Sequence, residues 1–197
     1  MPSFDRGFKS WTEKSSLNIR RDLGLKPYES LPFHALARYL DVQLWTPKNV
    51  QGMATDHLKQ LLELDSSSWS AVTIQKNQRY IIIYNPRHSL GRQSNDIMHE
   101  LSHLLAAHEP SQLIVSADSE VVLRSFDQKR EDEADWLAGC LLLPREALLH
   151  IKKQGISDEK ACDLYKISEQ LLTYRFNITG VNIQTNGWPK QGARSGR

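Results

Sequence analysis

The apolar residues of this 197-residue chain recur with two spacings, which divide it into helices and a few strands. Apolar positions three and four residues apart are typical of helices that bury one face. This spacing, with capping residues and prolines as boundaries, predicts helices over residues 10–23, 32–40, 56–64, 95–105, 127–143, 145–153, 157–165 and 168–176.

Three short segments have the composition of strands. Residues 42–45 alternate between apolar and polar, and residues 69–74 and 79–84 are rich in β-branched and aromatic side chains. The polar residues 75–78 separate the last two segments, which predicts a β-hairpin. Residues 80–84 are almost continuously apolar, so we expect that strand to be covered on both faces.

The helix predicted over residues 95–105 carries His-Glu-x-x-His at positions 99–103. Residues four apart lie on the same face of a helix, so His99 and His103 can bind one metal ion. Glu100 lies about 100° further round, where it can hold and deprotonate water instead of binding the metal. Ser94 can cap the start of this helix. The motif predicts a metallopeptidase site that needs a third protein ligand.

The acidic cluster at positions 131–135 supplies the candidates for that third ligand. At about 100° per residue, Asp135 falls within roughly 40° of Glu131, whereas Glu133 falls nearly opposite. Two alanines share the face of Glu131, which lets two helices approach closely. We therefore expect Glu131 to bind the metal and Asp135 to accept a hydrogen bond from a ligating histidine. Glu133 stays open as the alternative ligand.

Helical phase also sets aside another histidine. If the metal helix continues, His108 lies about 180° from His99, so we expect it at the helix end or on the surface. Two imidazoles and one carboxylate suit zinc, although manganese or iron can occupy such a site.

Composition changes this picture little. Hydrophobic residues make up 40% and charged residues 24%, and the net charge of +2 does not indicate a nucleic-acid-binding protein. No apolar run approaches the roughly 20 residues of a membrane span, and residues 1–20 contain no apolar signal core. We therefore expect a cytoplasmic protein that does not associate with membranes.

The two motifs together resemble those of the ImmA/IrrE family of metallo-endopeptidases. Residues 97–105 are similar to the family's metal helix, and residues 131–144 to its Glu-x-x-Ala-Asn/Asp-x-Phe-Ala-x-x-Leu-Leu-Met-Pro segment. Leu137 and Leu143 replace the family's usual Phe and Met, which are apolar exchanges that leave the chemistry untouched. The likeness covers about residues 18–180.

The resemblance implies a fold of the α+β class with a zincin-like, minimal metallopeptidase core. In it, a small, mostly antiparallel sheet packs on the metal helix, with helices at both ends of the chain. The resemblance also implies a zinc-dependent endopeptidase that cleaves a helix-turn-helix transcriptional repressor, a separate chain, and so derepresses mobile-element or stress-response genes.

We divide the chain into four parts on these grounds. They are a flexible or helical N-terminal lead (1–17), a metallopeptidase domain (18–153), a C-terminal helical cap similar to a helix-turn-helix (154–184) and a disordered basic tail (185–197). We expect residues 109–125 to form a lid that restrains the peptidase.

The expected reaction is hydrolysis of a peptide bond. The metal ion polarises the scissile carbonyl and acidifies water, while Glu100 takes the proton from water and passes it to the leaving amine. We expect the strand at residues 80–84 to present an edge to which an extended substrate adds. Candidate contacts to the substrate or transition state are Arg92, Tyr174 and Arg175.

A non-proteolytic regulatory module is the second class of function. Two short helices in residues 157–176, with the basic tail, could bind DNA or a repressor in a protein that keeps the metal site. Replacing Glu100 distinguishes the two classes, because repressor inactivation that survives this change requires no peptidase.

Overall fold

The computed structural model describes residues 4–76, 78–108 and 127–185. The helices are α1 (Phe8–Asp22), α2 (Phe33–Tyr39), α3 (Thr55–Lys59), α4 (Leu90–Leu105), α5 (Gln128–Leu142), α6 (Arg145–Gln154), α7 (Asp158–Tyr165), α8 (Glu169–Thr179) and α9 (Val181–Thr185). The strands are β1 (Gln43–Trp45), β2 (Ala71–Lys76) and β3 (Arg79–Tyr84), with single turns η1 (Pro47–Asn49) and η2 (Gln60–Leu64). The expected α+β class is confirmed. The expected lid and residues 186–197 of the expected tail lie outside the described residues.

The three strands form one mixed sheet in the order β1-β3-β2. β2 and β3 pair antiparallel from Ala71 opposite Tyr84 to Lys76 opposite Arg79, which confirms the predicted hairpin. β1 pairs parallel with β3, from Gln43 opposite Ile81 to Trp45 opposite Ile83. The sheet therefore combines a longer antiparallel pair with a short parallel one.

β3 is the central strand of this sheet. Ile81 and Ile82 on it are 4% and 0% exposed, so the expectation that the strand is covered on both faces is confirmed. Because β3 is paired on both sides, our expectation that it presents an edge to the substrate is wrong. Among the described strands, β2 lies at the edge of the sheet opposite β1.

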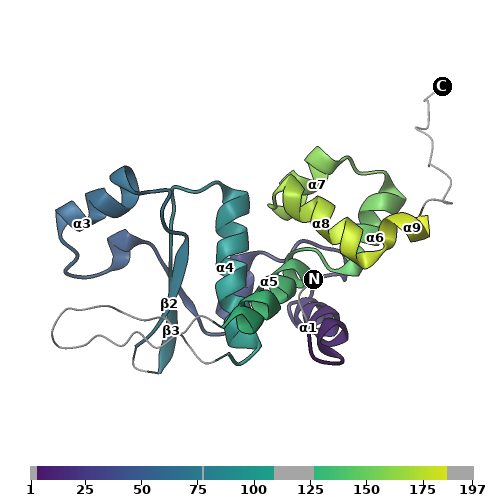
Figure 1. Ribbon diagram of the computed structural model, residues 1–197, viewed down its shortest axis with the longest axis horizontal. Coiled ribbons are helices and arrows are strands. Elements are labelled where there is room, and N and C mark those ends of the chain that lie inside the picture. The colour runs from purple at the N-terminus through teal and green to yellow at the C-terminus, as the bar shows by residue number, and fades with distance from the viewer. Residues whose placement is uncertain (1–3, 77, 109–126, 186–197) are drawn as a thin grey trace.

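Helix α4 joins the sheet to the helical part of the molecule. It contacts both β2 and β3, and α5 packs against it (Figure 1). The buried apolar residues along this contact include Ile97, Leu101, Leu137 and Leu141, all 0% exposed. The helix begins five residues earlier than expected, because the Ser89 hydroxyl accepts a hydrogen bond from the backbone N–H of Arg92 and so caps it. Ser94, the expected cap, lies inside the helix and is buried.

The C-terminal helices α6 to α9 gather at the opposite end of the molecule from α3 (Figure 1). Lys166, between α7 and α8, has a φ of 52°, the left-handed conformation in which many helices end. No helix in the described parts of the chain combines the length and the apolar character that a membrane crossing requires. The expected boundary between residues 17 and 18 falls inside α1, which contacts α5.

Arg20 fastens α1 to α5 from within the core. Its side chain is fully buried, and burial lowers its pKa to about 10. The guanidinium donates to the carbonyl of Leu141 at 2.7 Å, to the carbonyl of Glu29 at 2.9 Å and to the hydroxyl of Ser16. Because these acceptors are shielded from water, one side chain satisfies groups from three segments.

We expect Arg20→Met to lower the free energy of unfolding by about 2–4 kcal/mol, because it leaves buried acceptors without a donor. Urea unfolding followed by circular dichroism measures the change. The matched control is Arg21→Met, since the Arg21 side chain is 73% exposed and pairs with Asp22 at the surface. A loss no larger for Arg20→Met than for the control would contradict this role.

Candidate functional site

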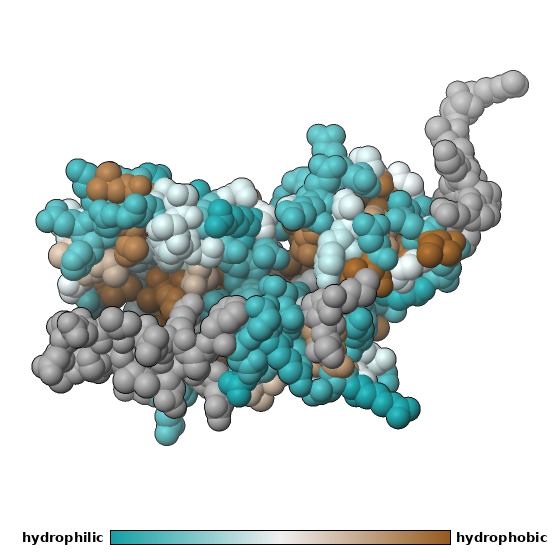
Figure 2. Space-filling model, in the orientation of Figure 1, coloured by the Kyte–Doolittle hydropathy of each residue, from teal (hydrophilic) through white to brown (hydrophobic). Residues whose placement is uncertain are grey.

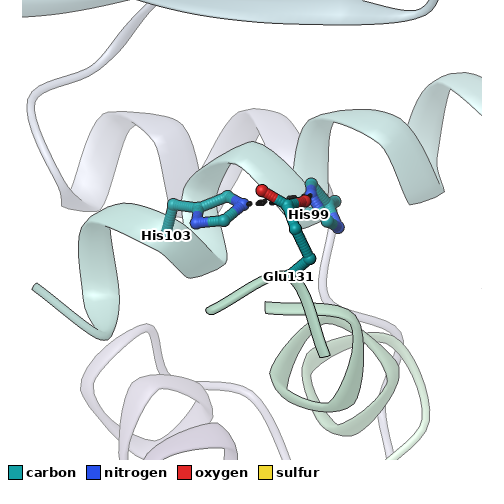
Figure 3. A group of neighbouring side chains, drawn as sticks. All are labelled: His99, His103 and Glu131. Atoms are coloured by element: carbon teal, nitrogen blue, oxygen red, sulfur yellow. Dashed lines mark hydrogen bonds and ion pairs between the residues drawn. The ribbon is translucent and has the colours of Figure 1, made fainter. Parts of the chain in front are cut away.

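Three potential metal-binding side chains converge where α4 meets α5. The Nε2 atoms of His99 and His103 lie 3.0 Å apart, and Oε2 of Glu131 lies 3.2 Å from the first and 3.6 Å from the second. Figure 3 shows both rings turned from α4 toward the carboxylate that reaches across from α5. Helical phase predicted this grouping, and the structure brings all three residues together.

The spacing of these three atoms fits a small metal ion. Ligand atoms about 2.0–2.1 Å from a tetrahedral zinc ion lie roughly 3.3 Å from each other, and the three observed separations bracket that value. Two imidazole nitrogens and a carboxylate oxygen are also a donor set that zinc prefers. Within the described residues, His99, His103 and Glu131 make the one group of three such side chains close enough to share an ion.

Asp135 holds the other nitrogen of the His99 ring. Its Oδ1 lies 2.7 Å from Nδ1 of His99, one helical turn along α5 from Glu131. A carboxylate that accepts from Nδ1 leaves the lone pair of Nε2 directed at the ion site. The structure therefore places Asp135 where the helical phase predicted it.

His103 also has a partner for its second nitrogen, and helical phase missed it. Nδ1 of His103 lies 3.0 Å from Nδ1 of His108, whose Nε2 lies 3.1 Å from Oε2 of Glu133. The expectation of His108 at the helix end is confirmed, but the surface position is wrong, because its side chain is only 8% exposed. Glu133, the alternative ligand, faces His108 instead of the other two histidines.

Glu100 approaches the site from the sheet side. Its carboxylate accepts a hydrogen bond from the hydroxyl of Thr73 in β2, and it is half-buried. The remaining capacity of the carboxylate is free to hold water beside the converging nitrogen atoms. A group that acts as a general base also needs a substrate within reach. The strand that contacts Glu100 is β2, which lies at the edge of the sheet away from β1.

The chain matches the family model of the IrrE N-terminal-like domain, Peptidase M78, over residues 56–177. It belongs to the M78 peptidase family. The matched residues include both helices that supply the converging side chains, so the likeness to ImmA/IrrE proteins is confirmed. Membership points to a metal-dependent peptidase.

The fold has a solved counterpart. A Mycobacterium tuberculosis transcriptional regulator superposes with a TM-score of 0.53 at 13% sequence identity, over 88% of this chain and 48% of the regulator. The M78 chain thus spans about half the length of that protein, and the likeness concerns the fold. A comparison with curated proteins found no match.

The two imidazoles of the M78 site have opposite pKa shifts. Burial lowers the pKa of His99, but the hydrogen bond and charge of Asp135 outweigh it and raise the pKa above its usual value. Burial, followed by the charge of His99, lowers the pKa of His103.

Two of the candidate substrate contacts line a cavity beside the site. This cavity, of about 830 Å³, lies between the start of α4 and helices α7 and α8, and Arg92, Asp135 and Tyr174 are on its wall. Figure 2 shows the surface hollowed there, with apolar side chains inside. The guanidinium of Arg92 donates a hydrogen bond to the hydroxyl of Ser70 at 3.3 Å. Arg92 precedes His99 by seven residues, which is about 10 Å along the helix. Arg92 and Tyr174 therefore share a wall with Asp135 but do not join the three converging atoms.

The expectation that Arg175 contacts the substrate is wrong. This side chain is 1% exposed, donates to the carbonyl of Leu143 at 3.0 Å and pairs with Glu13 at 2.6 Å. Arg175 of α8 therefore connects this helix to the C-terminal end of α5 and to α1. Periodicity alone gave no sign that this arginine is buried.

Glu131→Ala should remove tight zinc binding, because it leaves two of the three converging ligands. We expect a loss larger than the roughly 10–100-fold that follows removal of an outer partner of a ligand. Competition with a chromophoric chelator measures the affinity. Asp132→Ala is the control on the same helix, since this carboxylate bonds only the exposed Gln128 side chain in the described structure. Equal affinity of the two variants would exclude Glu131 as a ligand.

Asp135→Ala should lower zinc affinity about 10–100-fold while the fold is kept, because His99 loses the acceptor that orients its ring. The same competition assay and the Asp132→Ala control apply. Since the Asp135 side chain is 71% exposed, its removal should leave the unfolding transition almost unchanged. Affinity equal to that of the unaltered protein would show that the 2.7 Å contact does not support the site.

Proposed function

We propose that this M78 protein is a zinc-dependent endopeptidase in which His99, His103 and Glu131 bind the ion and Glu100 is the general base. The observation that carries the proposal is the convergence of three ligand atoms with separations of 3.0, 3.2 and 3.6 Å. Membership of a peptidase family supports it. Manganese or iron would satisfy the same donors, and zinc is the metal that this set favours.

When bound, a zinc ion would supply Lewis-acid chemistry that polarises a carbonyl and lowers the pKa of water. Glu100 holds the attacking water through one carboxylate oxygen while Thr73 orients the carboxylate. It accepts the proton of the water and delivers it to the nitrogen of the leaving amine. Asp135 keeps the ring of His99 turned toward the ion throughout.

The substrate is proposed to bind as an extended strand along β2. This strand pairs with β3 on one side, and no other strand in the described residues pairs with it. An unpaired edge offers backbone N–H and C=O groups to a peptide in the extended conformation. Because Thr73 of β2 contacts Glu100, a peptide on this edge passes next to the catalytic carboxylate.

A helix-turn-helix transcriptional repressor is the proposed substrate, and its cleavage would derepress mobile-element or stress-response genes. The support is the resemblance to ImmA/IrrE peptidases and the family match. The structural neighbour from Mycobacterium tuberculosis is a transcriptional regulator, which is compatible with a regulatory setting.

We expect Glu100→Gln to lower the rate of repressor cleavage by about 10²–10⁴-fold, because the amide cannot accept the proton of the water. Zinc affinity and the unfolding transition should be kept. The test incubates zinc-loaded protein with candidate repressors and follows fragments by mass spectrometry, with and without chelator. Glu63→Gln, at an exposed glutamate of η2, is the matched control.

Two outcomes would contradict the proposal. Fragments that persist in chelator would exclude a metal-dependent reaction. Repressor inactivation that survives Glu100→Gln, with the repressor intact, would favour the non-proteolytic binding module. In the described structure, the helical pair for that module is α7 and α8, which are joined by residues 166–168.

A further inference from the structure

His103 and His108 are joined twice, once through their side chains and once through the backbone. Their Nδ1 atoms lie 3.0 Å apart. The backbone N–H of His108 also donates to the carbonyl of His103 at 2.9 Å, and that of Ala107 donates to Leu104 at 3.1 Å. These two bonds form the turn with which many helices end, so the end of α4 itself returns His108 to His103.

The turn keeps an unfavourable backbone conformation to do this. Ala107 has a φ of 52°, in the left-handed region where glycine is the usual residue and a Cβ atom is unfavourable. Ala107 is exposed, so the two backbone hydrogen bonds of the turn hold this conformation in place. The direction of His108 therefore follows from the geometry of this turn, which the conformational preference of alanine alone does not favour.

The protons along the chain from His103 to Glu133 can be assigned in one consistent way. If Nε2 of His103 offers its lone pair to an ion, the neutral ring carries its proton on Nδ1. That N–H can donate only to an unprotonated Nδ1 of His108, which then carries its own proton on Nε2. The second N–H donates to the carboxylate of Glu133, 3.1 Å away. Every donor in the series therefore meets an acceptor.

This series is shielded from water. The side chains of His108 and Glu133 are 8% and 14% exposed, whereas Asp135, which performs the equivalent task for His99, is 71% exposed. Hydrogen bonds in a shielded setting are stronger, and a missing partner there is more costly. The outer contacts of His103 should therefore orient its ring at least as firmly as Asp135 orients that of His99.

We propose that His108 and Glu133 are positioning residues for the metal centre. They fix the tautomer and the orientation of the His103 ring through a second imidazole, as Asp135 does directly for His99. Neither residue touches the ion or the substrate. The inference rests on the metal centre of the proposed function, but it is independent of which peptide bond is cleaved.

The test compares zinc affinity of the full chain in three variants. His108→Phe keeps a ring without hydrogen bonds, and we expect a loss of about 10–100-fold. His108→Gln keeps an acceptor and a donor on one side chain, and it should restore most of the affinity. His57→Phe, at an exposed histidine of α3, is the matched control and should bind zinc as the unaltered protein does. Circular dichroism of the zinc-free proteins shows whether each variant folds.

Glu133→Ala adds a coupling test. Because Glu133 acts through His108, the double variant His108→Phe/Glu133→Ala should lose no more zinc affinity than His108→Phe alone. If the losses of zinc affinity from the two single substitutions instead add up in the double variant, the proposed chain of hydrogen bonds from His103 through His108 to Glu133 would be overturned. Glu63→Ala controls for removal of a glutamate. The losses of zinc affinity should not track the free energies of unfolding of the zinc-free variants, because such a correlation would mean that these residues only support the fold.

Nitrogen-15 NMR of the zinc-loaded, unaltered protein tests the proton assignment without any substitution. We expect protons on Nδ1 of His103 and on Nε2 of His108. A proton on Nδ1 of His108, equal affinity of His108→Phe and the unaltered protein, or His108→Gln no better than His108→Phe would overturn the inference. An unaltered protein that binds no zinc would overturn both this inference and the proposed function. Zinc binding that responds to His108 in a protein without peptidase activity would overturn the proposed reaction alone.

Discussion

The close approach of α4 and α5 is the contact on which the candidate metal centre depends. Ala134 and Ala138 are 0% and 2% exposed and lie by helical phase on the face of α5 that carries Glu131. Their small side chains let the carboxylate come within 3.2 Å of the His99 ring. Helix α5 is also held by α1, through hydrogen bonds from Arg20 to the carbonyl of Leu141 and from Ser16 to the carbonyl of Cys140. The geometry of the candidate metal site is therefore a result of helix packing, with little contribution from loops.

The two histidines are held in different ways, which makes the centre asymmetric. The exposed carboxylate that holds His99 belongs to the wall of a cavity of about 830 Å³, so one side of the centre is open to solvent and ligands. The partners of His103 are buried at the end of α4, so the other side is closed. Glu100, the proposed base, is held from a third direction by the sheet. Three elements thus meet around one site, and each fixes a different chemical group.

Helical phase predicts the direction of a side chain only within a continuous helix. This explains which residues of the candidate site could be placed from the sequence. Glu131 and Asp135 lie inside a regular helix and were placed correctly. His108 lies beyond the last turn of α4, where a left-handed residue reverses the chain, so its predicted direction does not apply. Arg175 is buried by contacts with α1 and α5 that no local pattern encodes. The apolar run at residues 80–84 already indicated a central strand, which conflicts with the edge role we assigned to it.

Both the proposed reaction and the role of the outer residues require one metal ion between His99, His103 and Glu131. Anomalous diffraction at the zinc edge, from crystals of the zinc-loaded protein, locates such an ion without reference to activity. We predict one strong anomalous peak that is bonded to Nε2 of both histidines and to the carboxylate of Glu131. A peak bonded to other side chains, or none at this position in a zinc-loaded crystal, would contradict the proposed metal centre.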